Sequence, residues 1–277
     1  MSFEVIPACD LSLADQASLT NRAFAEYVAG WANLDAAGLA RFVSLQGADL
    51  AHSRFLRDRT ALAGFGYITR TGTISRLSAM AFVPTARGTG AASHLLLHLL
   101  EEARGRKDCA MVLEVIEQNP RAHRFYQRHG FREIARLEGW RGSSDQIESA
   151  AAENADVEEI SIQELLHLPA HDDYPTIPWQ ISRYAIAKVV GARAFRTGKA
   201  CVAISDPESS PIRIYGLISA SGNQEELRAT LAGTMRCFPA REFFAPPLFP
   251  ADLSQQIFHP LGFRQEPISQ FLMRRDL

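Results

Sequence analysis

Cysteine is scarce in this chain, and long apolar runs are missing. The four cysteines, Cys9, Cys109, Cys201 and Cys237, show no CxxC or other metal-ligand spacing. No apolar run approaches the roughly 18 residues of a membrane-spanning helix. The first ten residues carry an acid and a proline and no basic segment ahead of a long apolar one, so no signal peptide is expected. These absences predict a cytoplasmic protein with reduced thiols and no membrane partner.

Net charge is also close to zero, with a formal value of −2. No basic surface for nucleic acid is therefore expected. An apolar fraction of 47% and a charged fraction of 22% are ordinary for globular proteins, and 277 residues suggest about two domains. Lysine and arginine are missing between Arg141 and Arg183, where nine acids occur. This stretch is interpreted as a solvated linker and helix face, or alternatively as an acidic wall that attracts a cationic amine.

What the first half does contain is a regular alternation of strands and helices. Alternating and apolar patterns predict strands, and Ser12 and Asp35 are expected to cap helices. The expected strands are 3–8, 51–56, 62–70, 74–83 and 110–116, and the expected helices are 12–28, 36–45, 92–103 and 120–129.

A glycine loop joins one of these strands to the helix that follows. The strand stops at Pro84, and the small residues of Arg87-Gly88-Thr89-Gly90-Ala91-Ala92 lead into an apolar helical stripe. Free N–H groups point outward at a helix N-terminus, where the dipole is positive and glycines allow close approach. Such a loop is typical of a diphosphate-binding site.

A second block of residues follows this helix. Leu113-Glu114-Val115 lies in the apolar strand 110–116, Asn119-Pro120 opens another helix, and Gly130-Phe131 ends it. Together the two blocks resemble the GNAT superfamily of acetyl-CoA-dependent N-acetyltransferases. Arg87-x-x-Gly90-x-Ala92 matches that family's Arg/Gln-x-x-Gly-x-Gly/Ala loop, and Glu114, Asn119, Ala122, Tyr126 and Gly130-Phe131 match its second block at the usual spacing.

The resemblance implies an α/β (α+β) GNAT fold, a mixed and mostly antiparallel sheet flanked by helices. It also implies transfer of an acetyl group from acetyl-CoA to a small-molecule or peptide amine by direct attack. The residues expected to hold acetyl-CoA are Met80, Ala81 and Phe82 on the strand edge, Arg87, Gly88, Thr89, Gly90, Ala91, Ala92 and Ser93 in the loop and first turn, and Asn119.

The same resemblance makes Tyr126 the general acid. The Glu that many members carry on the strand before the loop is missing, since Ser75, Arg76, Ser78 and Ala79 stand there. Glu114 is then the candidate base, with Glu117 and His171 as alternatives. A carboxylate in a buried strand needs a partner, so a structural role for Glu114 is equally open.

The second half resembles the family more weakly. Its end, Leu261-Gly262-Phe263 followed by a strand, looks like the end of a GNAT domain, but residues 219–226 hold one glycine where the phosphate loop is expected. We therefore expect an acetyltransferase domain over 1–140, a linker over 141–156 and a degenerate GNAT-like domain over 157–277 that binds no CoA. The expected strands are 157–160, 192–195, 199–204, 212–220, 241–244 and 269–273. A helix capped by Ser161 is expected after the first of them, and further helices are expected over 181–190, 224–235 and 252–259.

Several alternatives remain open at this point. Gly88-x-Gly90-x-x-Ser93 nearly matches a dinucleotide-binding fingerprint, although Pro84 to Arg87 separate the strand from the first glycine. The first domain could also be a non-catalytic acyl-CoA sensor. His94 and His98, or the cluster of His167, His171, Asp172 and Asp173, could bind metal, but solvated side chains are the preferred interpretation. Both a monomer and a homodimer are compatible with the sequence.

Overall fold

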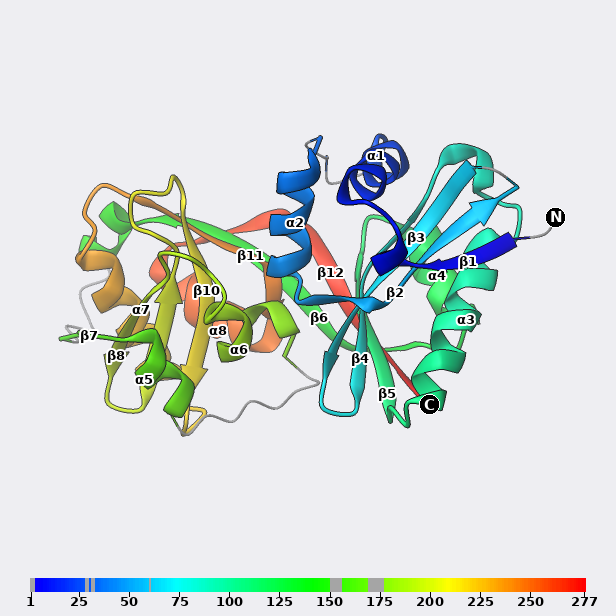
Figure 1. Ribbon diagram of the computed structural model, residues 1–277. Coiled ribbons are helices and arrows are strands. Elements are labelled where there is room, and N and C mark those ends of the chain that lie inside the picture. The colour runs from blue at the N-terminus through cyan, green and yellow to red at the C-terminus, as the bar shows by residue number, and fades with distance from the viewer. Residues whose placement is uncertain (1–2, 28–29, 31–32, 60, 150–155, 169–176) are drawn as a thin grey trace. The chain divides into compact units, whose positions relative to one another are not determined.

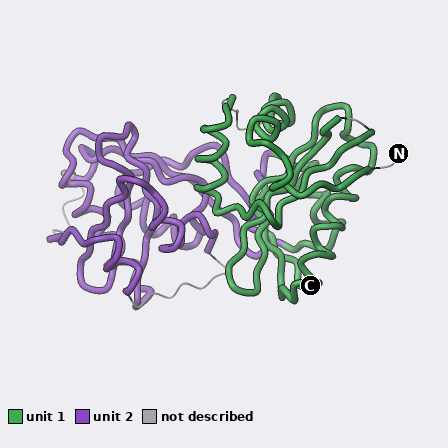
Figure 2. The backbone as a smooth tube through the Cα atoms, viewed as in Figure 1, with its two compact units in different colours: residues 1–115, 119–132, 273–277 green, residues 116–118, 133–272 purple. Residues whose placement is uncertain are grey.

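The computed structural model describes the chain except for residues 1–2, 28–29, 31–32, 60, 150–155 and 169–176. The chain divides into two compact units (Figure 2). One hydrophobic core cluster lies in each: that of Phe55 and Phe65 in unit 1 and that of Phe249 and Phe258 in unit 2. Unit 1 comprises residues 1–115, 119–132 and 273–277, and unit 2 comprises residues 116–118 and 133–272. No helix among the described residues is both long and apolar enough to cross a membrane.

The strands of unit 1 lie side by side in the order of the sequence, β1-β2-β3-β4-β5. Neighbours from β1 to β4 are antiparallel, whereas β4 and β5 are parallel. The mixed and mostly antiparallel sheet that the sequence predicts is thus confirmed. The bounds are β1 Phe3–Pro7, β2 Ala48–Asp58, β3 Ala61–Thr71, β4 Ile74–Phe82 and β5 Ala110–Ile116.

Helices cover both faces of this sheet (Figure 1). Phe65 and Tyr67 on β3 point to one face and pack in the core that α1 and α2 complete. Gly66 between them lies on the other face, and a Cβ there would come within 2.7 Å of Leu99 on α3. The bounds are α1 Leu13–Phe24, α2 Ala36–Leu45, α3 Ala91–Gly105 and α4 Pro120–Arg128.

Short-range capping sets where most of these helices begin. The side chains of Ser12, Asp35 and Asn119 accept hydrogen bonds from backbone N–H groups in the first turns of α1, α2 and α4, as predicted. The helix expected over 12–28 ends earlier, at Phe24. Gly130 after α4 has φ of +80°, which suits the glycine expected at that helix end.

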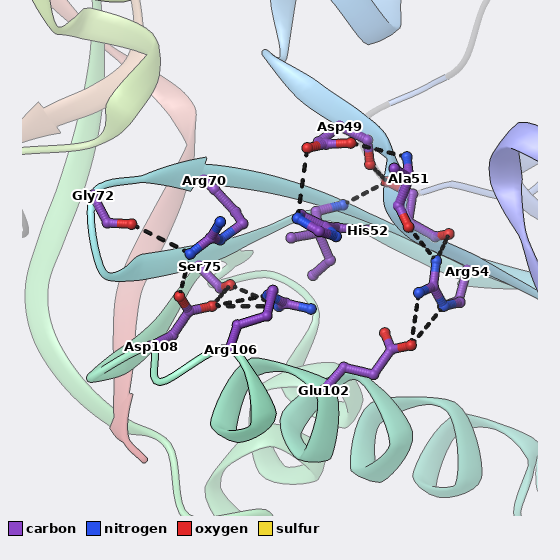
Figure 3. A network of polar contacts seen from close by, with 12 residues as sticks. Asp49, Ala51, His52, Arg54, Arg70, Gly72, Ser75, Glu102, Arg106 and Asp108 are labelled. Atoms are coloured by element: carbon purple, nitrogen blue, oxygen red, sulfur yellow. Dashed lines mark hydrogen bonds and ion pairs between the residues drawn. The ribbon is translucent and has the colours of Figure 1, made fainter.

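A buried polar network fastens α3 and the strand that follows it to the sheet (Figure 3). The Asp108 carboxylate, whose side chain is fully buried, accepts hydrogen bonds from Arg70 on β3 and Ser75 on β4, both at 2.6 Å, and pairs with Arg106 at 3.3 Å. Burial raises the pKa of this carboxyl, but the hydrogen bonds from Arg70 and Ser75 and the charges of Arg70 and Arg106 outweigh it, so the pKa is lowered overall. Asp108 is therefore a carboxylate at neutral pH and joins three elements.

Unit 2 repeats much of this architecture with different residues. Its strands lie in the order β12-β6-β11-β10-β9-β8-β7, and β10 and β11 are parallel, like β4 and β5. The bounds are β6 Arg132–Ser143, β7 Glu158–Ile160, β8 Arg193–Thr197, β9 Ala200–Ile204, β10 Ile212–Ser219, β11 Glu242–Pro250 and β12 Arg264–Asp276.

The helices of unit 2 also lie on two faces of its sheet. α7 and α8 pack on one side in the larger core, and Leu165 on α5 and Ile186 on α6 pack on the other. A capping box of Ser161 and Glu164 starts α5. The bounds are α5 Ile162–His167, α6 Arg183–Ile186, α7 Gln224–Arg236 and α8 Ala251–Phe258.

Several elements of the second half differ from the predictions, among them one helix and the expected linker. The helix expected over 181–190 is wrong: a 3₁₀ turn at Trp179–Ile181 precedes α6, which ends at Ile186. Val190 is 97% exposed, so no packing supports a longer helix there. Within the segment expected to be a linker, β6 continues to Ser143 and a 3₁₀ helix spans Ser144–Ser149, while residues 150–155 lie outside the described residues.

Candidate functional site

The glycine loop of unit 1 has the backbone that a diphosphate site requires. β4 ends at Phe82, a 3₁₀ turn spans Pro84–Ala86, and α3 begins at Ala91. Gly88 and Gly90 have φ of +82° and +91°, in the left-handed region that only glycine adopts freely. A Cβ built on either glycine would meet none of the described atoms within 4 Å. The loop is thus open on the side where a ligand would lie.

The first turn of α3 offers free hydrogen-bond donors. Its N-cap is Gly90, which has no side chain, so the leading N–H groups are not capped by one. No acidic residue lies in this first turn. The uncapped N–H groups and the positive end of the helix dipole therefore favour an anion at Ala91, Ala92 and Ser93.

The Arg87 side chain lies against α1. Its Nε donates to the Phe82 carbonyl at 3.2 Å, its Nη2 donates to the Ala23 carbonyl at 3.2 Å, and its Nη1 pairs with Glu26 at 3.0 Å. Ala23 carries one of the last carbonyls of α1, which the helix itself leaves unbonded. Arg87 thus fastens the glycine loop to the end of α1 rather than facing the free N–H groups.

The end of β4 beside this loop has an edge open to a ligand. The parallel pairing of β4 with β5 joins Ile74–Arg76 to Ala110–Val112 and goes no further along these described strands. Met80, Ala81 and Phe82 still pair with β3 on their other side. Their edge toward β5 can therefore accept an extended amide chain as an added strand.

Tyr126 on α4 is a buried tyrosine, 8% exposed, whose ring packs against Phe125 and Phe131 at 5.3 and 5.7 Å between centroids. Burial raises the pKa of its phenol, and the nearby Tyr27 phenol raises it further. The hydroxyl is therefore protonated at neutral pH and can donate a proton. Asn119, at the start of the same helix, accepts a hydrogen bond from Ala122 N at 3.1 Å and so has a capping role.

Sequence reasoning did not identify Tyr27 as part of this site. It lies just after α1, its ring packs edge-on against Phe24 at 4.9 Å, and burial raises the pKa of its phenol. Because its charge acts on Tyr126, two phenols lie in one neighbourhood. No motif surrounds Tyr27, so only the folded chain brings it to the site.

Glu114 forms a buried ion pair with Arg76. Three N–H···O contacts of 2.7 to 3.1 Å join the two side chains, which are 5% and 2% exposed. Arg76 also donates to the amide oxygen of Gln46. The guanidinium of Arg76 thus occupies one side of the carboxylate, and Glu114 could act as a base only from within this ion pair.

The other candidate bases and metal ligands lie elsewhere. Glu117 belongs to unit 2, where it pairs with Arg136 at 2.9 Å. His98 pairs with Glu102 at 3.3 Å, and the ring of His94 packs beside Phe3. His171, Asp172 and Asp173 lie outside the described residues. Among the residues that the structure does describe, no three His, Cys, Asp or Glu side chains gather to hold a metal.

Unit 2 fills the equivalent helix start with its own side chains. Asn223 caps α7 by accepting from the N–H groups of Glu225 and Glu226 at 3.0 and 3.3 Å. The Glu226 carboxylate bends back to accept from Lys199 N at 2.8 Å and from the Ser221 hydroxyl. A small pocket does remain beside the ends of β10 and β11, with Leu217 in its wall. The donors that a diphosphate needs, however, are capped or face a carboxylate.

A protein-family model matches part of the first half of the chain. Residues 22–131 match the model of the acetyltransferase (GNAT) family. A comparison with curated protein sequences gives no match.

Solved structures resemble the whole chain at low sequence identity. A GCN5-related N-acetyltransferase from Sphaerobacter thermophilus is 13% identical with a TM-score of 0.65, over 99% of this chain and 95% of that one. A tandem GNAT protein from the clavulanic acid biosynthesis pathway is 14% identical with a TM-score of 0.62, over 99% and 98%. A GCN5-related N-acetyltransferase from Anabaena variabilis is 15% identical with a TM-score of 0.64, over 99% and 72%. These likenesses confirm the GNAT fold.

Proposed function

Residues 22–131 form an acetyltransferase domain of the GNAT family, and from this premise we propose that the protein moves the acetyl group of acetyl-CoA to an amine acceptor. The observation that carries the proposal is the uncapped start of α3 behind two open left-handed glycines. The donor supplies an activated thioester, and the acceptor is a small-molecule or peptide amine. The free thiols of all four cysteines support a cytoplasmic site of action.

We assign donor binding to unit 1 alone. Backbone N–H groups from Gly88 to Ser93 hold the diphosphate, and the open edge of Met80 to Phe82 pairs with the amides of the pantetheine arm. Arg87 holds the loop to the end of α1 through its hydrogen bond to the Ala23 carbonyl and its ion pair with Glu26. Unit 2 binds no CoA in this proposal, because Asn223 caps the N–H groups of Glu225 and Glu226 at the start of α7. The Glu226 carboxylate also accepts from Lys199 N beside this helix start, where it would repel a diphosphate.

Tyr126 is the proposed general acid. In direct attack the amine nitrogen forms a bond to the acetyl carbon, the C–S bond breaks, and the leaving thiolate takes a proton. A phenol that burial keeps protonated can donate that proton and recover it from solvent. Glu114 remains the candidate base that takes the proton of the amine, and it would do so from within its ion pair with Arg76.

A non-catalytic acyl-CoA sensor is the second candidate, and one observation favours it. Glu114 and Glu117, the two described carboxylates proposed as bases, are each in an ion pair with an arginine. The dinucleotide alternative does not fit, because unit 1 has an antiparallel sheet from β1 to β4.

A turnover assay with Tyr126→Phe separates the enzyme from the sensor. Release of free CoA is followed with a panel of amines, and we expect kcat to fall roughly 10²-fold while acetyl-CoA affinity is unchanged. Tyr67→Phe is the matched control, since it removes another buried phenol hydroxyl of unit 1. Wild-type protein that binds acetyl-CoA but acetylates no amine would support the sensor instead.

A further inference from the structure

One arginine in unit 2 has no acidic partner within the described part of the chain. Arg213 lies near the start of β10 and is half-buried, and its Nε is fully buried without a hydrogen-bond partner there. The described carboxylates of unit 2 form no ion pair with it. A buried guanidinium without a counter-charge is costly, so its ordinary partner is an anion.

Each unit has an arginine on the first strand of its parallel strand pair, but the residues that surround the two arginines differ. In unit 1, Arg76 on β4 stands opposite Val112 in the parallel register, and Glu114 two residues further along β5 neutralises it. In unit 2, Arg213 stands opposite Phe244, and the residue two further along β11 is Pro246. The repeat therefore keeps the arginine and lacks the acid.

Aromatic rings flank the Arg213 guanidinium instead. Its central carbon lies 5.4 Å from the Tyr215 ring centroid and 6.0 Å from that of Phe244. Arg141 lies over Phe244 as well, at 4.8 Å, but Glu242 and Glu266 neutralise it at 2.7 Å each. Of the two described arginines beside Phe244, only Arg213 therefore lacks a neutralising carboxylate, and its guanidinium lies beside the rings of Tyr215 and Phe244.

We propose that Arg213 binds the carboxylate of a small organic monoanion, whose apolar body packs against Tyr215 and Phe244. A planar guanidinium fork matches the two oxygens of a carboxylate. A single uncompensated positive charge is matched by one negative charge, which favours a carboxylate over a phosphate dianion. Of the guanidinium nitrogens of Arg213, only Nε is fully buried without a partner, so the outer nitrogens are the ones left for a ligand. The site belongs to unit 2 and does not depend on acetyl transfer.

Calorimetric titration of the full-length protein with sodium benzoate tests this site. We expect saturable binding of one benzoate per chain, at constant ionic strength, weakened roughly tenfold or more in Arg213→Met. Arg193→Met is the matched control, because Arg193 also lies over two rings, Phe195 and Phe238, but is already paired with Glu159. Equal affinity in wild type and Arg213→Met, or no saturable binding, would overturn the proposal. Saturable binding of inorganic phosphate in place of benzoate would overturn the carboxylate assignment.

Thermal unfolding without ligand gives an independent readout. Loss of an uncompensated buried charge should leave the melting temperature of Arg213→Met equal to or above that of the wild type. A melting temperature below that of the wild type would show that the folded chain already stabilises the Arg213 charge, and it would end the proposal. Arg213→Lys keeps the charge without the planar fork, and it should fold and bind benzoate more weakly.

Discussion

Glu114→Gln tests whether the carboxylate on β5 holds unit 1 together. The substitution keeps the shape of the side chain and removes its charge. Arg76, which is 2% exposed, would then be left with two neutral amide oxygens, those of Gln46 and of the new glutamine. Because the Arg76 guanidinium stays buried, water cannot take the place of the carboxylate charge that it loses.

The expected cost follows from the burial of the pair. Breaking a buried ion pair by removing one partner costs about 3–5 kcal/mol, a large share of the roughly 5–15 kcal/mol by which a folded protein is stable. The three contacts of 2.7 to 3.1 Å and the 5% exposure of Glu114 place this pair in the buried class. For a chain of this size, ~3 kcal/mol corresponds to a fall of about 6–12 °C in melting temperature.

Urea denaturation of the variant and of one matched control measures this cost. Glu4→Gln removes the carboxylate of an exposed pair with Arg57, in which Glu4 is 62% exposed, and should change the free energy of unfolding by less than about 1 kcal/mol. Removing both members of the buried pair, as Arg76→Leu with Glu114→Leu, should cost less than Glu114→Gln alone. If Glu114→Gln were as stable as wild type, the ion pair would not carry the stability assigned to it here.

Two further predictions concern side chains before and after α3, Arg87 and Asp108. Asp108→Asn should lower the free energy of unfolding by about 2–4 kcal/mol at pH 7. Because the pKa of Asp108 is lowered in the folded state, the full difference should be present above the ordinary aspartate pKa of 3.8 and should vanish as the pH falls through the folded-state pKa. Chemical denaturation of both proteins at several pH values measures this difference. Arg87→Ala should lower acetyl-CoA affinity less than tenfold, about 1.4 kcal/mol, because its side chain binds Ala23 and Glu26, and calorimetry showing a larger loss would place Arg87 on the diphosphate itself.

Local signals in the sequence were sufficient for the parts of the fold that depend on near neighbours. Ser12, Asp35 and Asn119 begin helices because each side chain reaches a backbone N–H three residues on, a relation that the sequence displays directly. Gly88 and Gly90 also mark the loop directly in the sequence, since only glycine adopts their positive φ angles freely. The backbone of this loop could therefore be predicted from the sequence, while its role in binding the donor stays a prediction.

Contacts between distant residues could not be predicted in this way. A buried carboxylate at Glu114 called for a partner, but only the pairing of β4 with β5 identifies Arg76 as that partner. Tyr27 reaches the neighbourhood of Tyr126 through the packing of α1, which no motif announces. Arg87 matches the motif of the loop, yet its side chain turns toward α1.

Tertiary structure also overrode local propensity in the second half. A strand was predicted over 241–244, ahead of Pro246 and Pro247, which central strands usually exclude. β11 nevertheless continues to Pro250 through a shift in its register with β6 between Ala245 and Phe249. By contrast, the helix predicted over 181–190 is shorter than expected. It ends at Ile186, because the exposed Val190 has no apolar packing that would stabilise further turns.

Calorimetric titration of CoA into the wild type and two glycine variants tests the central claim most directly. Gly90→Asp and Gly222→Asp both place a carboxylate at an open left-handed glycine, with φ of +91° and +68°, at the loops of unit 1 and unit 2. The account predicts one CoA per chain, a loss of more than tenfold, above about 1.4 kcal/mol, in Gly90→Asp, and unchanged affinity in Gly222→Asp. Two CoA per chain, or full affinity in a folded Gly90→Asp variant, would contradict it.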